Sequence, residues 1–250
     1  MSDHILVTLG KEYFSQSKEN KMFFVYDEEA NALLNDIDHY PHAFVLACCM
    51  DRQAKAERVW MIPYLVMKEI GSFDIHDLAQ ISKGEYSRIF KEQSLHRFND
   101  SMAGIFYNAV QLIIDKYDGD ASKIWKGKPS SSAVVSRFLE FKGVGIKIAT
   151  MATNILARDF KILFSDYYSI DVSPDVHVRR VLSRIGLIGE NATTDQIIYR
   201  ARELNPEFPG IIDHTVWEIG RTWCDSQNPL CDKCPVNMEC KYCLERQQNE

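Results

Sequence analysis

The sequence contains no long hydrophobic run and no excess of positive charge. No apolar stretch among its 250 residues approaches the roughly 20 residues that a membrane-spanning helix requires. The 29 Lys and Arg residues are outnumbered by 35 Asp and Glu residues, and the net charge of −6 argues against a general binder of polyanions. Residues 1–4 also lack the basic head of a secretory signal peptide. We therefore expect no membrane association.

Basic residues nevertheless gather locally, and a nucleic-acid partner would have to be bound there. The patches are Arg52, Lys55 and Arg58; Lys142 and Lys147; and Arg179, Arg180 and Arg184. Each patch by itself is equally well explained as a solvated helix face.

Strand-like alternation, internal repeats and low-complexity linkers are absent too. Between residues 105 and 117 the apolar side chains recur with the 3.6-residue period of a helix. Further stripes of this kind cover 5–18, 28–36, 54–70 with a kink at Pro63, 134–141, 176–187 and 211–223. Only 160–170 has strand-like composition. The pattern predicts an all-α fold.

The sequence also lacks the cysteine distribution of a secreted disulfide framework. Two of its seven cysteines, Cys48 and Cys49, are adjacent in an apolar run, where we expect buried thiols. The other five follow residue 223. A reducing, cytoplasmic compartment is therefore expected.

Four of these late cysteines have the spacing of a metal centre. Cys224, Cys231, Cys234 and Cys240 form the pattern Cys-x6-Cys-x2-Cys-x5-Cys. Four thiolates in one short segment can hold a [4Fe–4S] cluster or a tetrahedral zinc ion. A zinc knuckle would use Cys243 in place of Cys224, but its two Cys pairs would be closer together than is usual for zinc. The spacing favours the cluster and leaves zinc as the alternative.

A second motif is the glycine pair Gly143-Val144-Gly145, which lies between two helical stripes. Glycines permit a tight turn, and the N-terminus of the helix that follows can bind a phosphate through its free N–H groups. Lys147 falls in the first turn of that helix. An ordinary turn between two helices would explain the glycines equally well.

A third motif is Asp175, which follows Ser173-Pro174 at the start of another helical stripe. Pro and an acidic residue are both favoured at helix starts. Asp175 could therefore serve only as a helix cap. Alternatively, Lys147 and Asp175, each in the first turn of its own helix, could share one cleft.

Taken in order, these motifs resemble the helix-hairpin-helix DNA glycosylases, specifically the endonuclease III branch with its cluster loop. The resemblance covers about residues 38–240 and includes Gly220-Arg221-Thr222-Trp223-Cys224 at the entry to the loop. It implies two helical lobes: a six-helix lobe, 34–158, with the hairpin, and a second lobe, 1–33 plus 159–250, closed by the loop. It also implies a [4Fe–4S] cluster on Cys224, Cys231, Cys234 and Cys240, with Cys243 as a bystander.

The resemblance implies an enzyme that flips a damaged or modified base out of duplex DNA. Lys147 matches the family's nucleophile, which attacks the sugar C1′, and a lysine at this position implies strand cleavage by β-elimination. Asp175 matches the carboxylate that stabilises the charge on the sugar. The expected activity is that of a bifunctional DNA glycosylase and abasic-site lyase.

DNA contacts follow from the same resemblance. Gly143, Val144 and Gly145 are expected to hold the DNA backbone through main-chain N–H groups, supported by Lys142. Gln53 aligns with a glutamine that fills the gap left by the flipped nucleotide. The expected partner is double-stranded DNA with a damaged base or an abasic site, bound by a monomer.

Several features depart from the family pattern and keep other functions open. The segment 160–169 is an insertion that could reshape the base pocket or form a surface loop. Asp171 is a second carboxylate near Asp175, without its sequence context. The alternatives are a glycosylase without lyase activity, a non-catalytic iron–sulfur DNA-binding protein, and an electron-transfer protein.

Overall fold

The computed structural model describes residues 3–16 and 22–248, and every regular element within these residues is helical. The all-α prediction is therefore confirmed. The chain forms two compact units, each described by itself: unit 1 contains residues 1–18, 130–132 and 153–250, and unit 2 contains residues 19–129 and 133–152. The lobes expected from the resemblance, 34–158 and 1–33 plus 159–250, stay predictions.

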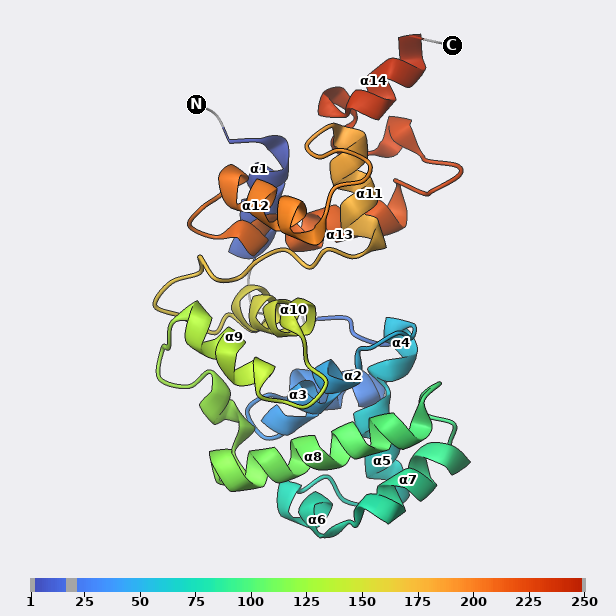
Figure 1. Cartoon of the computed structure of the whole chain (residues 1–250), viewed down its shortest axis with the longest axis vertical. Helices are drawn as coiled ribbons and strands as arrows, with labels where there is room; N and C mark the ends of the chain where they lie inside the picture. The colour runs from blue at the N-terminus through green and yellow to red at the C-terminus, as the bar shows by residue number, and fades with distance from the viewer. Residues whose placement is uncertain (1–2, 17–21, 249–250) are drawn as a thin grey trace. The chain divides into compact units, whose positions relative to one another are not determined.

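Unit 2 is built around two helices, α3 and α8 (Figure 1). Its elements are α2 (Glu28–Asn35), α3 (Pro41–Met50), α4 (Ala56–Val59), α5 (Ile62–Ile70), α6 (Ile75–Gln80), α7 (Lys83–Glu92), α8 (Asn99–Tyr117) and the 3-10 helix η1 (Ala121–Ile124). All ten residues of α3 are buried, because this helix is apolar on every side. The long helix α8 packs against α3 and α7 and places Phe106 in the core. α9 (Ser131–Leu139) and α10 (Ile146–Arg158) contribute residues to both units.

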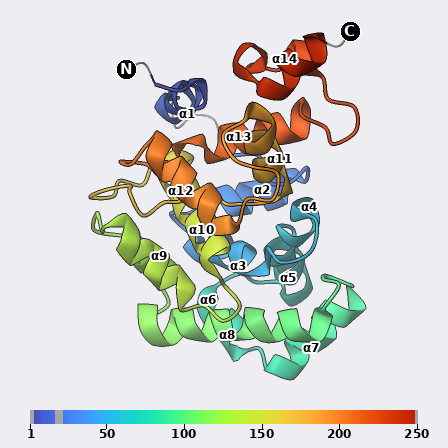
Figure 2. The ribbon, with the colours of Figure 1, turned by 45° about the horizontal axis from the view of Figure 1, so that its top comes forward.

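Unit 1 contains the N-terminal helix and the C-terminal part of the chain. Its elements are α1 (Ile5–Ser15), α11 (Val176–Ile185), α12 (Thr194–Leu204), η2 (Pro209–Ile212), α13 (Asp213–Thr222), η3 (Cys231–Lys233), η4 (Asn237–Glu239) and α14 (Lys241–Gln248). Helices α11 and α13 lie side by side (Figure 2). The face of α11 that is buried carries Val178, Val181, Leu182 and Ile185, the spacing of one helical stripe.

The prediction of one continuous helix over 54–70 is wrong. The structure breaks it into α4 and α5, and Pro63 lies in the first turn of α5 rather than at a kink inside a helix. Proline suits a first turn, because an N–H there would have no acceptor within the helix. The break therefore falls at Trp60 and Met61, before Pro63.

The segment 160–170 has strand-like composition but forms no strand in the structure. Its aromatic residues pack locally instead: Phe164 is buried, and the Tyr167 ring lies 5.1 Å from that of Phe208. Ser169 N donates to Ser131 Oγ at 3.1 Å. Leu163 and Tyr168 are exposed. The insertion is thus partly packed onto unit 1, and its effect on a base pocket stays a prediction.

No helix in the described part of the chain has the length and apolar character needed to cross a membrane.

Candidate functional site

The hairpin between α9 and α10 is formed by residues 141–145, all within unit 2. Phe141 and Val144 are buried and anchor the turn, whereas Lys142 is exposed. Val144 N donates to Phe141 O at 3.0 Å. Gly143 has a φ of +87°, a left-handed conformation that residues with a side chain rarely adopt. The turn therefore requires glycine at position 143.

Gly145 differs from Gly143, because a Cβ built on it would meet no atom within 4 Å. The group that Gly145 offers to a ligand is its main-chain N–H. The N–H groups of Gly143, Gly145 and Ile146 have no hydrogen-bond partner within residues 3–16 and 22–248. Free N–H groups at the start of a helix can bind phosphate oxygens. Val144 already donates its N–H inside the turn, so its contribution would be the buried side chain.

Lys147 is the second residue of α10, directly after the hairpin, and its side chain is exposed. The first turn of α10 is fixed by Thr150, whose Oγ1 donates to Ile146 O at 2.9 Å. The predicted position of Lys147 in a first helical turn is confirmed. Its catalytic role stays a prediction.

Asp175 is the N-cap of α11 in unit 1. Its Oδ1 accepts hydrogen bonds from His177 N and Val178 N, both at 2.8 Å. The cap uses only one carboxylate oxygen, and Oδ2 makes no hydrogen bond to the described residues. Asp175 therefore caps the helix and still has one oxygen available to another group.

Asp171, the second carboxylate considered, is engaged on both oxygens. It is buried, and Arg202 donates to Oδ1 and Oδ2 at 2.8 Å each. This bidentate ion pair holds the segment before α11 against α12. The hydrogen bonds that Arg202 donates to Asp171 raise the pKa of Arg202. Unlike Asp175, Asp171 thus has a hydrogen bond on each of its two oxygens.

Gln53 is exposed at the tip of the loop 51–55 between α3 and α4, with a φ of 47°. Arg97 Nη1 donates to Gln53 O at 3.3 Å, and His96 Nε2 lies 2.9 Å from Arg52 O. Two residues from the loop before α8 thus hold the backbone of residues 52 and 53.

His96 is neutral in this arrangement. Its Nε2 must donate to a carbonyl oxygen, and its Nδ1 accepts from Phe98 N at 3.1 Å. Burial lowers the pKa of His96, and the nearby positive charge of Arg58 acts in the same direction. One neutral ring therefore joins the Gln53 loop to the start of α8.

The late cysteines of unit 1 surround one small hollow. Cys224, Cys231, Cys234, Cys240 and Cys243 all line it, together with Trp223, Pro229 and Tyr242. The segment closes on itself, because Leu230 N donates to Trp223 O at 2.7 Å. The five thiols lie within one segment of the sequence, and the fold places them around this hollow.

A metal centre on these thiols stays a prediction. In a tetrahedral zinc site the sulfurs lie about 3.8 Å apart, given a Zn–S bond of about 2.3 Å. No group of three or more His, Cys, Asp or Glu side chains in the described part of the chain could hold a single metal ion. Whether these thiols hold a [4Fe–4S] cluster or a zinc ion is therefore not decided by their placement around the hollow.

Two arginines of α11 hold the cysteine segment, and sequence reasoning treated both only as a basic patch. Arg184 Nη1 donates to Cys224 Sγ at 3.3 Å and to Asp225 O at 2.6 Å. Arg180 Nε donates to Cys224 O at 2.7 Å, and its Nη2 donates to Gly220 O at 2.8 Å. The helix that Asp175 caps is therefore bonded directly to the cysteine loop. The only signal in the sequence for this contact is the four-residue spacing of Arg180 and Arg184, which places both on one face of α11.

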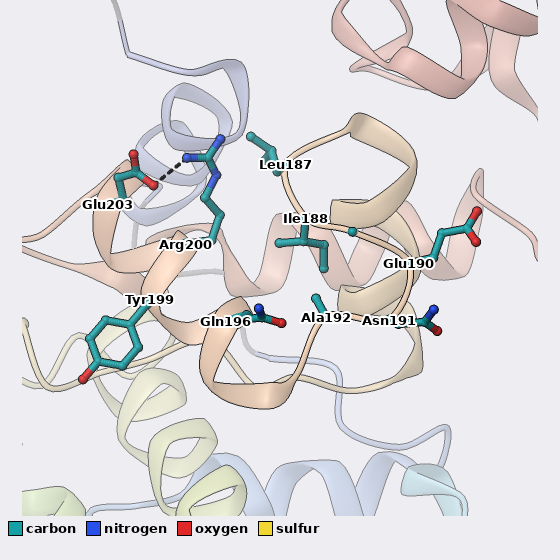
Figure 3. A pocket seen from close by; sticks show the side chains of 10 residues that line it. Leu187, Ile188, Glu190, Asn191, Ala192, Gln196, Tyr199, Arg200 and Glu203 are labelled. Carbon is teal, nitrogen blue, oxygen red and sulfur yellow. Dashed lines mark hydrogen bonds and ion pairs between the residues drawn. The ribbon is translucent and has the colours of Figure 1, made fainter.

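Another hollow of unit 1 lies elsewhere, between the segment 187–192 and α12 (Figure 3). It has a volume of about 720 Å³. The Arg200–Glu203 ion pair stands at its edge, with an N–O distance of 2.5 Å. None of the predicted catalytic, DNA-binding or metal residues lines this hollow.

Two solved structures share the fold across nearly the whole chain. A trapped endonuclease III–DNA covalent intermediate has a TM-score of 0.63 and 16% identity, with 97% of this chain and 96% of that chain covered. A thermostable thymine-DNA glycosylase has a TM-score of 0.61 and 14% identity, with 96% of each chain covered. The fold is that of the helix-hairpin-helix DNA glycosylases.

Relatives by sequence narrow this class. The endonuclease III of Thermotoga maritima is 25% identical over 175 residues, which are 70% of this chain and 71% of that protein. The endonuclease III of Sulfolobus acidocaldarius is 32% identical over 111 residues, 43% of this chain and 44% of that protein. An adenine DNA glycosylase of Arabidopsis thaliana is 22% identical over 189 residues, 73% of this chain and 28% of that protein. No family model matches. Fold and relatives together support a likeness of the chain to the helix-hairpin-helix DNA glycosylase superfamily, and within it to the endonuclease III branch.

Proposed function

We propose that this protein is a base-excision DNA repair glycosylase that also cleaves the strand at abasic sites. The observation that carries the proposal is the exposed Lys147 on the first turn of α10, directly after a hairpin with free N–H groups. Relatives named endonuclease III and adenine DNA glycosylase support the glycosylase class. One structural neighbour is itself a covalent intermediate with DNA.

In the proposed reaction Lys147 Nζ attacks C1′ of the damaged nucleoside. The N-glycosidic bond breaks, and the base leaves with its electron pair and takes up a proton. The C1′–O4′ bond then breaks and opens the sugar ring; of the two amine protons, one balances the proton taken up by the base and the other balances the proton on O4′, which leaves a Schiff base between Nζ and C1′. Loss of the C2′ proton then expels the 3′ phosphate, which is β-elimination and nicks the strand. The free Oδ2 of Asp175 is the group proposed to stabilise positive charge on the sugar.

DNA binding in this proposal uses the hairpin and the Gln53 loop. The N–H groups of Gly143 and Gly145 bind backbone phosphates, supported by Lys142. Gln53 is exposed at the tip of a loop whose backbone is fixed, so its side chain is suited to enter the gap left by a flipped nucleotide. The partner is duplex DNA, bound by a monomer in the cytoplasm at the nucleoid.

The cofactor in this proposal is a [4Fe–4S] cluster held by Cys224, Cys231, Cys234 and Cys240. When bound, it cross-links four thiolates and so folds the loop that follows α13. The Arg184 guanidinium donates to Cys224 Sγ and stabilises the negative charge of a thiolate there. The cluster's part is to shape the loop, since base removal and strand cleavage require no redox change.

Borohydride trapping tests the proposed function. Purified protein is mixed with duplexes that carry an abasic site, thymine glycol, 8-oxoguanine, uracil, or a mismatched thymine or adenine. Borohydride reduces a Schiff base to a stable amine, so we expect a covalent complex with the abasic duplex and with duplexes whose base is removed.

Two lysine variants at the hairpin give this test its control. Lys147→Ala is expected to abolish trapping, whereas Lys142→Ala removes an equal charge and is expected to bind more weakly but still trap. Trapping that survives in Lys147→Ala would show that another amine attacks the sugar. Base release without any trapping would identify a glycosylase without lyase activity. If the protein neither releases a base nor is trapped, it is a DNA-binding protein without this activity.

A further inference from the structure

Arg52 contacts the hairpin although the two are far apart in the sequence. A Cβ built on Gly143 would lie 2.7 Å from Arg52 Nη1 and 2.8 Å from Ile105 Cδ1. The guanidinium therefore rests directly against the turn, and only a glycine leaves room for it. All three residues belong to unit 2. The loop that carries Gln53 and the hairpin that precedes Lys147 thus meet at Arg52.

The Arg52 guanidinium makes no hydrogen bond or ion pair with the described residues. An arginine offers five N–H donors and no acceptor, so this group places several unused donors beside the turn. The N–H groups of Gly143 and Gly145 in the same turn are unused as well. Donors from a side chain and from the main chain are therefore concentrated at one place.

The contact is not needed to shape the loop, because the loop backbone has its own supports. His96 holds Arg52 O at 2.9 Å, and Arg97 donates to Gln53 O at 3.3 Å. Arg58 donates to Ser94 O on the same neighbouring loop. The first two bonds involve the main-chain oxygens of residues 52 and 53, and none of the three uses the Arg52 side chain, which is left available to a group outside the protein.

The charge around Arg52 favours an anion. Arg52, Arg58 and Arg97 all lie near enough to His96 for their positive charges to lower its pKa. Lys142 adjoins Gly143 and is exposed. Asp51 in the loop and Glu57 in α4 are the acids of this stretch, and the basic residues Arg52, Arg58, Arg97 and Lys142 outnumber them. A basic cluster thus exists on a chain whose net charge is −6.

We propose that Arg52 binds the DNA backbone together with the hairpin, its guanidinium donating to phosphate oxygens next to those bound by the N–H groups of Gly143 and Gly145. The proposal rests on the proposed function and adds to it a contact made by the Gln53 loop. A planar guanidinium can bind a phosphate through two parallel hydrogen bonds, which a lysine cannot do. Gln53 would thereby be placed at a fixed distance from the phosphates held by the hairpin.

The salt dependence of DNA binding tests this proposal. Each phosphate contact releases counterions and contributes about 0.9 to the slope of log K against log salt concentration. Binding of an undamaged duplex is measured over a salt series for the wild type, Arg52→Gln, Arg52→Lys and Lys91→Gln. We expect Arg52→Gln to lower the slope by about 0.9, and to weaken binding about ten-fold at low salt. Arg52→Lys is expected to keep the slope and lose several-fold in affinity, because it keeps the charge without the bidentate geometry.

Lys91→Gln on α7 removes the same charge from a residue that pairs with Asp100, and it is expected to leave the slope unchanged. A slope in folded Arg52→Gln equal to that of the wild type would overturn the proposal, since a residue that only supported the turn would change affinity but not counterion release. Thermal unfolding identifies a misfolded variant. If Arg52→Gln does not fold, an unchanged affinity in Arg52→Lys overturns the proposal.

The two proposals fail separately. If the wild type is trapped on abasic DNA and Arg52→Gln keeps the full salt slope, the glycosylase proposal stands and only the proposed Arg52 contact is refuted. If the wild type neither binds duplex DNA nor is trapped, both proposals are refuted.

Discussion

At the scale of single residues, the two oxygens of the Asp175 carboxylate allow it to cap a helix and also to act on a substrate. Its Oδ1 satisfies two N–H groups at the start of α11, while Oδ2 makes no bond to the described residues. The reading of Asp175 as a helix cap and its reading as a catalytic carboxylate are therefore compatible. The structure confirms the cap, and the catalytic role stays a prediction.

Two substitutions separate these roles. Asn caps helices about as well as Asp, so Asp175→Asn is expected to change the free energy of unfolding by less than about 0.5 kcal/mol, whereas Asp175→Ala is expected to cost about 1 kcal/mol. Both variants are expected to release damaged bases about 100-fold more slowly, because neither can stabilise positive charge on the sugar. Chemical denaturation and single-turnover base release are the measurements. Wild-type activity in Asp175→Asn would leave the residue with its cap alone.

At the scale of elements, the packing of α11 on α13 depends on the absence of a side chain. A Cβ on Gly220 would lie 2.6 Å from His177 Cβ and 3.1 Å from its Cα. The two helices approach closely here, and Arg180 of α11 donates to Gly220 O at 2.8 Å. The start of α11 and the entry to the cysteine loop are thereby joined at one crossing.

Two helical glycines test this crossing. Gly220→Ala is expected to lower the free energy of unfolding by about 1–3 kcal/mol, since the added methyl meets the backbone of α11. Gly84 on α7 is the matched control: its Cβ would meet only Ser82 Oγ at 3.8 Å. Gly84→Ala is expected to be neutral or to stabilise by up to about 1 kcal/mol, because alanine favours helix. Equal effects of the two substitutions on thermal unfolding would refute the close crossing.

The cysteine loop carries a prediction at the same scale. Cys240 and Cys243 are both buried and both line the hollow, so burial alone does not tell a ligand from a bystander. We expect Cys240→Ser to lose iron and sulfide and Cys243→Ser to retain both, at four of each per chain. Metal and acid-labile sulfide analysis of protein purified without oxygen decides this. Zinc without sulfide, lost in Cys243→Ser, would support the alternative knuckle of Cys231, Cys234, Cys240 and Cys243.

At the scale of the whole molecule, buried histidines link stability to pH. Burial lowers the pKa of His42 and of His96, and it lowers the pKa of His214 to about 3, helped by the charge of Arg158. The unfolded chain takes up protons on these residues near pH 6.5, before the folded chain does. Stability from the neutral rings is therefore full above about pH 7 and is lost as the pH falls through 6.5.

His214→Phe tests this dependence. Phenylalanine can keep the stacking on Tyr13, whose ring centroid lies 4.1 Å from that of His214, but it does not titrate. Between pH 7.5 and 5 the wild type is expected to lose about 2 kcal/mol of unfolding free energy through this residue. His214→Phe is expected to lose about 2 kcal/mol less unfolding free energy than the wild type over this pH range. The exposed residue His76 provides the control variant, His76→Phe. Parallel pH profiles for the wild type and His214→Phe would contradict the assignment.

Local patterns determined much of this protein before any contact between distant residues was known. The stripes at 105–117 and 176–187 became α8 and α11, because helical periodicity is a property of neighbouring residues. Local patterns were less decisive elsewhere: the segment 160–170, whose composition is strand-like, packs as an irregular segment, and Pro63 lies in the first turn of α5 rather than at a kink within one helix. Aromatic and β-branched residues suit both strands and packed loops, and proline is tolerated in a first helical turn.

The sequence by itself determined the helices, the glycine turn before Lys147, the cap position of Asp175 and the spacing of the cysteines. Each of these depends on residues a few positions apart, whose geometry the backbone dictates locally. Only the tertiary structure brought the Arg52 guanidinium to Gly143, His177 to Gly220 and Arg184 to Cys224. These contacts join segments 40 or more residues apart, and their partners are selected by how the buried faces of the helices pack, which no local pattern records.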